Sequence, residues 1–483
     1  MNSAEYLFEI DTEVPASYFE KLVDFIYRQY ITLQKQRFTN AIKEVTENQV
    51  KLSYFVLDAQ RKQLLKVEII CTQKITVKIS PMNPQISPQI VDEARQDVVI
   101  ATQMFEEKVR KATWYFAWQE GADIVPEKVK VQNKNFNQIL IETQILLFFI
   151  FIVLGMSLFL AVYNFAPQWF WIAPITLVSV QFLVVFYSRK IIARTSDWTI
   201  TRENPYIHIL EYHLPIGALE EIKETSPEQL AAIKEEVYRT IISKKGTIDC
   251  KEAQKVFTKY NVSCMEDNLL AKKINVYELV KNVADKFGYQ VPHIVVSNTM
   301  VPNAAASGPS PSRGVVLITT GLLVQLEEDE ITSVLGHEFG HLKGRDPLIL
   351  FGLTSAEFLF RFYVLFAFLP VILSSFLFIA YFWAVMTVIF FIAKFFEARA
   401  DLVSAIVVGK PKVLAEALEK IGFQRLLFER TPTFRLQEWI NLDAHPPIYF
   451  RIARLKQLQE PVKVKYPLIR SVKEVFSGFA TTI

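Results

Sequence analysis

A long run without any charged residue, from 143 to 188, constrains the fold of this chain more than any other feature. A helix needs about 20 apolar residues to cross a bilayer, so the run is long enough for two membrane-spanning helices. Asn164 and Pro167 interrupt it near the middle. We therefore predict spans at about 143–163 and 168–187, because a buried hairpin of a soluble protein is rarely so long or so rich in phenylalanine.

A second apolar block covers about 348–393, and Pro370 divides it into two further predicted spans, four in all. Its first half carries Glu357 and Arg361, which are four residues apart and therefore neighbours on a helix. Charged side chains inside a membrane face protein or water rather than lipid. The pair either lines a path from the bilayer to a catalytic site or holds the helices together, and the structural role is favoured.

Basic residues flank both apolar hairpins on their outer sides. They are Lys128, Lys130, Lys134, Arg189, Lys190 and Arg194 around the first, and Lys343, Arg345, Lys394 and Arg399 around the second. Lys and Arg next to membrane helices accumulate on the cytoplasmic side. We therefore predict a multi-pass protein of the cell membrane, with the lipid bilayer as a partner and with 190–347 and 394–483 facing the cytoplasm.

The overall charge balance excludes one class of partner. Lys plus Arg number 53 and Asp plus Glu number 50 in 483 residues, a net charge of +3, so nothing indicates nucleic acid. The acidic N-terminus lacks the long apolar core of a cleaved signal peptide. Cys71, Cys250 and Cys264 match neither zinc-ribbon nor disulfide spacing, so we expect free thiols in a reducing compartment.

Residues 1 to about 130 have the pattern of a soluble α+β domain. We expect a strand at 6–10, a long helix at about 16–45, strands at 51–57, 64–71 and 75–80, and a second long helix that ends near 121. This β-α-β-β-β-α order resembles that of helix-grip domains, which often enclose an apolar ligand. A docking or regulatory role fits the pattern at least as well.

The clearest chemical motif is HEFGH. His337 and His341 are four residues apart, so on a helix they share one face and can hold one zinc ion. Glu338 beside them can act as a general base on a water molecule. The surrounding pattern predicts a helix from about 326 to 343, with Gly344 as its stop. Alone, the motif could also belong to an ordinary helix that carries two histidines.

A pair of carboxylates follows the second apolar block, in the sequence EARAD. A catalytic zinc takes three protein ligands and leaves one position open. Glu397 can be the third ligand. Asp401, on the same helical face, can hydrogen-bond the far nitrogen of a zinc histidine and so fix its tautomer. Two carboxylates at this spacing usually lie on a solvated helix face. They are informative here because the predicted hairpin at 348–393 returns the chain to the same side of the membrane as HEFGH.

Two further segments carry groups suited to peptide hydrolysis. The small residues that begin at Asn303 and Ala304, with an apolar strand at 314–319, could leave backbone groups open to pair with an extended peptide. The sequence HPPIYFR contains His445 and Arg451, and an imidazole or guanidinium near the metal could stabilise an oxyanion. An ordinary edge strand and a structural histidine are the alternatives.

These motifs in this order resemble the HtpX family of membrane zinc endopeptidases, gluzincins related to the CAAX prenyl proteases. The resemblance covers roughly 275–460 and the hairpin at 143–188, through HEFGHLKGRD, EARAD, HPPIYFR, NVYELVKNVADKFGYQVPHIVV and NAAASG. Ala305 stands where the family often has an aromatic residue, and the N-terminal domain lies outside the family pattern. The resemblance implies that His337, His341 and Glu397 are the zinc ligands, that Glu338 is the catalytic glutamate, and that Asp401 supports one of the ligands. It also implies that Asn303 lies on the substrate-binding strand and that His445 and Arg451 lie near the oxyanion.

We therefore expect a multi-pass α-helical membrane protein. It combines a mainly helical gluzincin-type zinc peptidase domain, a small edge β-sheet and a helix-grip-like N-terminal α+β domain. Domains are predicted at 1–130, at 143–188 and 348–393 (the hairpins), and at 190–347 with 394–483 (the peptidase). The predicted activity is endoproteolysis of membrane or misfolded proteins in quality control, with one zinc ion per subunit. The alternatives are a CAAX-type prenyl-protein peptidase, which has more membrane helices, and a non-catalytic scaffold with a structural zinc.

Overall fold

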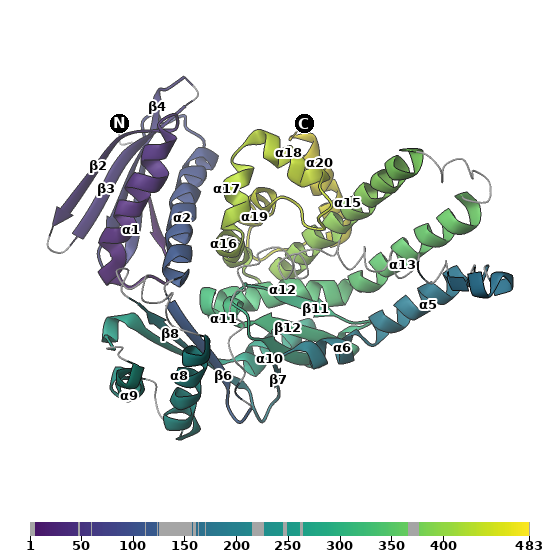
Figure 1. The fold of residues 1–483 in the computed structure, drawn as a ribbon. Coiled ribbons are helices and arrows are strands. Elements are labelled where there is room, and N and C mark those ends of the chain that lie inside the picture. The colour runs from purple at the N-terminus through teal and green to yellow at the C-terminus, as the bar shows by residue number, and fades with distance from the viewer. Residues whose placement is uncertain are drawn as a thin grey trace. The chain divides into compact units, whose positions relative to one another are not determined.

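The computed structural model describes residues 5–46, 49–58, 60–111, 113–122, 124, 157, 161–162, 164–169, 171–214, 227–244, 249–260, 264–365 and 376–482. They fall into two compact units (Figure 1). The first unit takes Met1–Glu127, Ile207–Lys273 and Glu419–Leu427, and the second takes Lys128–Tyr206, Ile274–Leu418 and Phe428–Ile483. Every site residue predicted above lies in the second unit.

A five-stranded antiparallel sheet forms the N-terminal part of the first unit. Its strands are β1 Tyr6–Ile10, β2 Phe38–Thr46, β3 Gln49–Leu57, β4 Gln63–Cys71 and β5 Ile75–Pro81, in the spatial order β1-β5-β4-β3-β2. Alternate residues of β5 are buried, as expected for a strand with one face on a core. The helices α1 Phe19–Phe25 and α2 Pro88–Lys111 pack against the sheet.

The sequence prediction for this part is right for four strands and wrong in the extent of both helices. The first helical region ends at Gln34, and most of its predicted remainder is β2. The second helix ends at Lys111, and the aromatic segment after it is strand β6 Thr113–Gln119. Pairing of β2 with β3, and of β6 with a strand far away in sequence, outweighs the helical periodicity of each segment. The likeness to helix-grip domains stays a prediction.

A second sheet in the first unit joins β6 to β8 Tyr206–His213 and β9 Leu269–Asn275. The helices α8 Pro227–Thr240 and α9 Cys250–Phe257 complete its core, which is rich in aromatic residues. The largest of these buried rings are Trp114, Phe116, Trp118, Tyr212 and Phe257.

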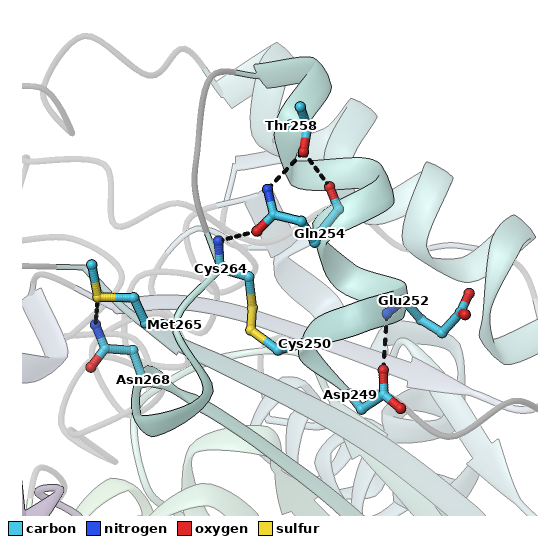
Figure 2. Close-up of a disulfide and its surroundings, with 8 residues drawn as sticks. All are labelled: Asp249, Cys250, Glu252, Gln254, Thr258, Cys264, Met265 and Asn268. Atoms are coloured by element: carbon cyan, nitrogen blue, oxygen red, sulfur yellow. Dashed lines mark hydrogen bonds between the residues drawn. A yellow bond between two sulfur atoms is a disulfide. The ribbon is translucent and has the colours of Figure 1, made fainter.

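Cys250 and Cys264 form a disulfide, so the prediction of three free thiols is wrong for this pair (Figure 2). Their Cα atoms lie 5.7 Å apart, a separation that a disulfide can bridge. Gln254 of α9 accepts a hydrogen bond from the backbone N–H of Cys264 (Figure 2). Such tertiary contacts bring the two cysteines together, and sequence spacing does not record them. Cys71 is free and buried.

Among the described residues, two helices of the second unit are long and apolar enough to cross a membrane, at Asp346–Leu365 and Ile379–Val407. A third apolar helix, α5 Ala173–Phe186, lies in the second predicted span and is shorter. The first predicted span, at 143–163, lies almost wholly outside the described residues, and so does Pro370, which was expected to divide the second apolar block. The number of four spans therefore stays a prediction.

The two long apolar helices are α13 Asp346–Phe360, continued by a helical turn, and α15 Phe376–Val407. Arg361 donates two hydrogen bonds to Glu357, at 2.9 and 3.1 Å, and Tyr381 of α15 donates one to the same carboxylate at 3.2 Å. The charged pair thus joins α13 to α15, which supports the favoured structural role.

The second unit also contains a four-stranded sheet with the order β11-β12-β10-β7. The strands are β7 Trp198–Ile200, β10 His293–Ser297, β11 Ala304–Ser307 and β12 Val315–Thr319. The helices are α6 Ser188–Thr195, α10 Val276–Phe287, α11 Thr320–Gln325, α12 Glu328–Gly344, α18 Pro432–Ile440, α19 Ile448–Lys456 and α20 Pro467–Ala480. Between α15 and α18 the chain forms α16 Pro411–Ile421 and α17 Phe423–Glu429. β10 and β12 run parallel, and β11 pairs antiparallel with β12 as an edge strand.

The helix α12, which carries HEFGH, begins and ends almost where the sequence predicts. Glu327 and Glu330 cap its first turn reciprocally through side chain and backbone. The last helical residue is Gly344, and Arg345 follows in a left-handed conformation with φ of 55°. The motif therefore lies on a regular helix, as the spacing of its histidines requires.

Candidate metal centre

Three side chains from two helices converge in the second unit. His337 and His341 extend from α12, and Glu397 extends from α15. The Nε2 atoms of the two histidines lie 3.1 Å apart, and each lies 3.3 Å from one oxygen of the Glu397 carboxylate. The structure thus brings together the three residues predicted as metal ligands.

The two helices approach closely because α12 has glycines on the face that meets α15. A Cβ atom on Gly336 would lie 2.6 Å from Oγ of Ser404, and one on Gly340 would lie 3.0 Å from Cα of Ala400. Ser404 also donates a 2.8 Å hydrogen bond to the backbone carbonyl of Ser333 on α12. A larger residue at either glycine would push the helices apart and separate the ligands.

A carboxylate lies behind each histidine. Asp401 Oδ1 is 2.9 Å from Nδ1 of His337, and Asp346 Oδ2 is 2.8 Å from Nδ1 of His341. A carboxylate at Nδ1 keeps the proton there and leaves the Nε2 lone pair for a metal. Asp401 was predicted in this place. Asp346 was missed, although it follows His341 by only five residues.

Each of these carboxylates is in turn held by a guanidinium. Arg451 donates hydrogen bonds to Asp401 at 2.9 and 2.7 Å, and Arg399 donates to Asp346 and to the backbone carbonyl of Gly340. Burial lowers the pKa of Arg451, but the charge of Asp401 outweighs this effect and raises it. Arg451 thus lies against Asp401, and its Nη1 is also 3.8 Å from Oε2 of Glu397, so its expected role at the oxyanion stays a prediction. Arg399 was not singled out as a site residue.

The carboxylates around the two histidines raise the pKa of both rings. Burial lowers the pKa of His337, but the neighbouring carboxylates of Asp401 and Glu397 outweigh it and raise that pKa above its ordinary value. Burial likewise opposes the charge of His341, while Glu397 and Asp346 raise its pKa to about 10. A metal must displace these protons, so its affinity should increase with pH.

Glu338 meets the edge strand β11. Its Oε2 accepts a 2.9 Å hydrogen bond from the backbone N–H of Ala306. Asn303 donates its backbone N–H to Thr319 Oγ1 at 2.9 Å, and Ala304 begins the strand. The two residues predicted for substrate binding therefore lie at the start of the strand whose third residue contacts Glu338.

His445 lies on the exposed side of the metal centre. Its side chain is 47% exposed, and its Nε2 is 3.7 Å from Glu397 Oε2. Its Nδ1 is 2.8 Å from Oδ1 of Asp443, a partner that the sequence did not reveal. Solvent access and closeness to Glu397 are compatible with a side chain that meets a substrate, and the expected role of His445 at the oxyanion stays a prediction.

The donor set fits a zinc ion. Two imidazole nitrogens and a carboxylate oxygen are ligands that zinc accepts, and three protein ligands leave a position for water. Oε2 of Glu397 is buried and accepts no hydrogen bond from any described residue, as expected for an atom that faces a metal. In the described part of the chain, His337, His341 and Glu397 form the one group of His, Cys, Asp and Glu with ligand atoms close enough to share an ion.

Comparison with known proteins identifies relatives of this part of the chain. The model of peptidase family M48 matches residues 271–459. "Protease HtpX homolog 2" of Methanosarcina acetivorans is 30% identical over 200 residues, which cover 35% of this chain and 67% of the relative. "Protease HtpX homolog" of Thermococcus kodakarensis is 30% identical over 228 residues, which cover 40% of this chain and 76% of the relative.

A solved structure, that of S. mikatae Ste24p, also matches. The match has a TM-score of 0.30 and 18% identity, and it covers 37% of this chain and 49% of that chain. At this TM-score it carries no argument about the fold.

Proposed function

This chain belongs to peptidase family M48 and is a metalloprotease, and on that premise we propose that it is an integral-membrane zinc endopeptidase that cleaves membrane or misfolded proteins near the bilayer surface on the cytoplasmic side. The observation that carries the proposal is the convergence of His337, His341 and Glu397, whose ligand atoms lie within 4.8 Å of one another. Its substrates are proteins, as its family implies. A role in protein quality control would follow from a preference for unfolded membrane proteins.

In this proposal His337, His341 and Glu397 hold one zinc ion per subunit. When bound, zinc would act as a Lewis acid that lowers the pKa of water and polarises the scissile carbonyl. Glu338 accepts a proton from the attacking water and later gives it to the leaving amine. The hydrogen bond from Ala306 sets the distance between this base and β11.

The residues around this centre bind and orient. An extended substrate would add to the edge of β11, which begins at Ala304 directly after Asn303, and would form backbone hydrogen bonds there. His445, held by Asp443, would donate a hydrogen bond to the oxyanion. Arg451 acts through Asp401, because its guanidinium contacts that carboxylate.

The proposed placement in the membrane rests on α15. This helix runs without interruption from a candidate span into EARAD, so Glu397 lies on the same rigid element as the apolar residues. Such continuity would hold the site close to the bilayer surface. The basic flanks of the hairpins at 143–188 and 348–393 support a cytoplasmic face. We propose 1–130 as an accessory domain.

A non-catalytic scaffold with structural zinc is the less favoured alternative. Structural zinc sites are closed by four protein ligands, whereas the described residues place three at this centre. A CAAX-type peptidase would share the same chemistry and differ in substrate.

The test uses the full-length protein, loaded with zinc and reconstituted in liposomes. We expect it to degrade an unfolded membrane protein, to stop when a chelator is added, and to recover when zinc is restored. Cleavage of a farnesylated peptide but not of the unfolded protein would favour the CAAX-type alternative. Cleavage of neither substrate by the zinc-loaded protein would contradict the proposal.

A further inference from the structure

We infer that Lys394 is a positioning residue that holds the loop carrying His445 against the helix carrying Glu397. Lys394 lies on α15, one helical turn before Glu397, and its side chain is fully buried. The inference rests on the proposed function, in which His445 stabilises the oxyanion.

The ammonium group of Lys394 contacts the loop at three points. Its Nζ donates hydrogen bonds to the backbone carbonyls of Asp443 and His445, the latter at 3.1 Å, and to Oδ1 of Asn441 at 3.4 Å. An ammonium has three donors and no acceptor, so it suits a cluster of carbonyl oxygens. Burial of a charge is unfavourable unless hydrogen bonds compensate it. The loop therefore provides the partners that allow a buried lysine at this place.

The apolar contacts of the loop fix its distance from α15 but not the direction of the imidazole. Ala444 is buried in a cluster with apolar residues of α15, namely Met386, Ile389, Phe390 and Ala393. Alanine carries no polar group that could orient its neighbours. The loop from 441 to 447 also contains no helix or strand that would do so.

Lys394 instead holds the two residues that orient the imidazole. Oδ1 of Asp443 accepts a 2.9 Å hydrogen bond from the backbone N–H of His445. The same oxygen lies 2.8 Å from Nδ1 of the imidazole. Because the backbone carbonyls of Asp443 and His445 both bind the ammonium of Lys394, these two residues cannot rotate together relative to α15. The 3.7 Å separation between His445 Nε2 and Glu397 Oε2 then depends on Lys394.

A double-mutant cycle tests the inference on the full-length, zinc-loaded protein. Lys394→Met keeps the apolar stem and removes the donors. We expect it to lower kcat about 10-fold or more with KM changed less than about threefold, because the substrate strand β11 is untouched. In a His445→Ala background the same change should cost less than about threefold, because the group that Lys394 positions is gone. Zinc content should stay at the wild-type level.

Lys410→Met is the matched control, because Lys410 is a half-exposed lysine of the same unit that pairs with Asp329, and it should leave kcat unchanged in both backgrounds. Equal losses from Lys394→Met in the two backgrounds, or no loss in the wild type, would overturn the inference. If Lys394→Met binds no zinc, the double-mutant cycle is repeated with Lys394→Gln. Failure of both variants to bind zinc also overturns the inference. Absence of chelator-sensitive cleavage in the wild type is a different result, which contradicts the proposed function itself.

Discussion

Asp401 Oδ1 lies 2.9 Å from Nδ1 of His337, and the guanidinium of Arg451 holds the same carboxylate from a second direction. Asp401→Asn replaces the charged acceptor with an amide of similar size. We expect the zinc affinity to fall about 10- to 100-fold, because the amide no longer fixes the tautomer of the histidine. Competition with a fluorescent chelator measures this change. An unchanged affinity would show that Asp401 does not orient the ligand.

Gly344 leaves room for the guanidinium that holds the second aspartate. A Cβ atom there would lie 1.8 Å from Nη2 of Arg399, so Gly344→Ala should displace Arg399 from Asp346. We expect weaker zinc binding, by about 10-fold. Gly352→Ala is the matched control, because a Cβ there meets no described atom within 4 Å. Equal zinc affinities for the two variants would contradict the role of Arg399.

The Cys250–Cys264 disulfide closes a loop of the first unit with a sequence separation of 14 residues. A bridge of this size typically stabilises a fold by about 3 kcal/mol, chiefly through the unfolded state. Cys264→Ser should therefore accelerate hydrogen exchange in α9 and leave that of α12 in the second unit unchanged. Unaltered exchange in α9 would mean that the bridge contributes nothing to local stability.

The same disulfide also tests the proposed side of the membrane. Disulfides seldom persist in a reducing compartment, whereas the basic flanks favour the cytoplasm for these residues. If the cytoplasmic placement is correct, an impermeant maleimide should label Cys250 and Cys264 only after cells are permeabilised and the disulfide is reduced. Labelling in intact cells after mild external reduction would place both residues on the outer side.

Glu106, buried in the first unit, predicts a pH-dependent stability. Burial, and next the charge of Glu13, raise its pKa to about 7 although Arg110 acts in the opposite direction. The folded state therefore binds more protons than the unfolded state between about pH 4.5 and 7. The stabilisation is fully present below that window and is lost as the pH rises through it. We compare the rate of amide hydrogen exchange in α2 of the wild type with the rate in Glu106→Gln at the same pH. The ratio of the wild-type rate to the variant rate should be higher at pH 8 than at pH 5. A ratio that does not change with pH would contradict the pKa shift.

The parts of the site that were predictable from the sequence are those set by spacing along a helix. His337 and His341 are one helical turn apart, and Glu338 directly follows His337, so the geometry of the helix alone sets the relative positions of the three side chains. Glu397 and Asp401 obey the same rule on α15. The residues that were missed, Asp346, Lys394, Arg399 and Asp443, act through contacts between elements. Arg451 was singled out, but its contact with Asp401 depends on the packing of α19 against α15.

The fold shows the same division between local and long-range information. Strands β3, β4 and β5 are consecutive hairpin partners, so their alternation and turns predict them. The strands β2 and β6 were assigned to helices because their sequences also fit helical periodicity. Their identity is decided by pairing, and for β6 the partner β8 lies far away in the sequence. The disulfide was missed because the approach of Cys250 to Cys264 is set by the packing of the folded chain and not by their spacing in the sequence.

The most direct test of the central claim is to measure zinc content and peptide cleavage on the same preparations of the wild type and Glu338→Gln. The account predicts one zinc ion per chain in both proteins. It predicts cleavage at least about 100-fold slower in the variant, because the base is lost while the ligands remain. Undiminished cleavage by Glu338→Gln, or cleavage by the wild type that survives removal of its metal, would contradict the account.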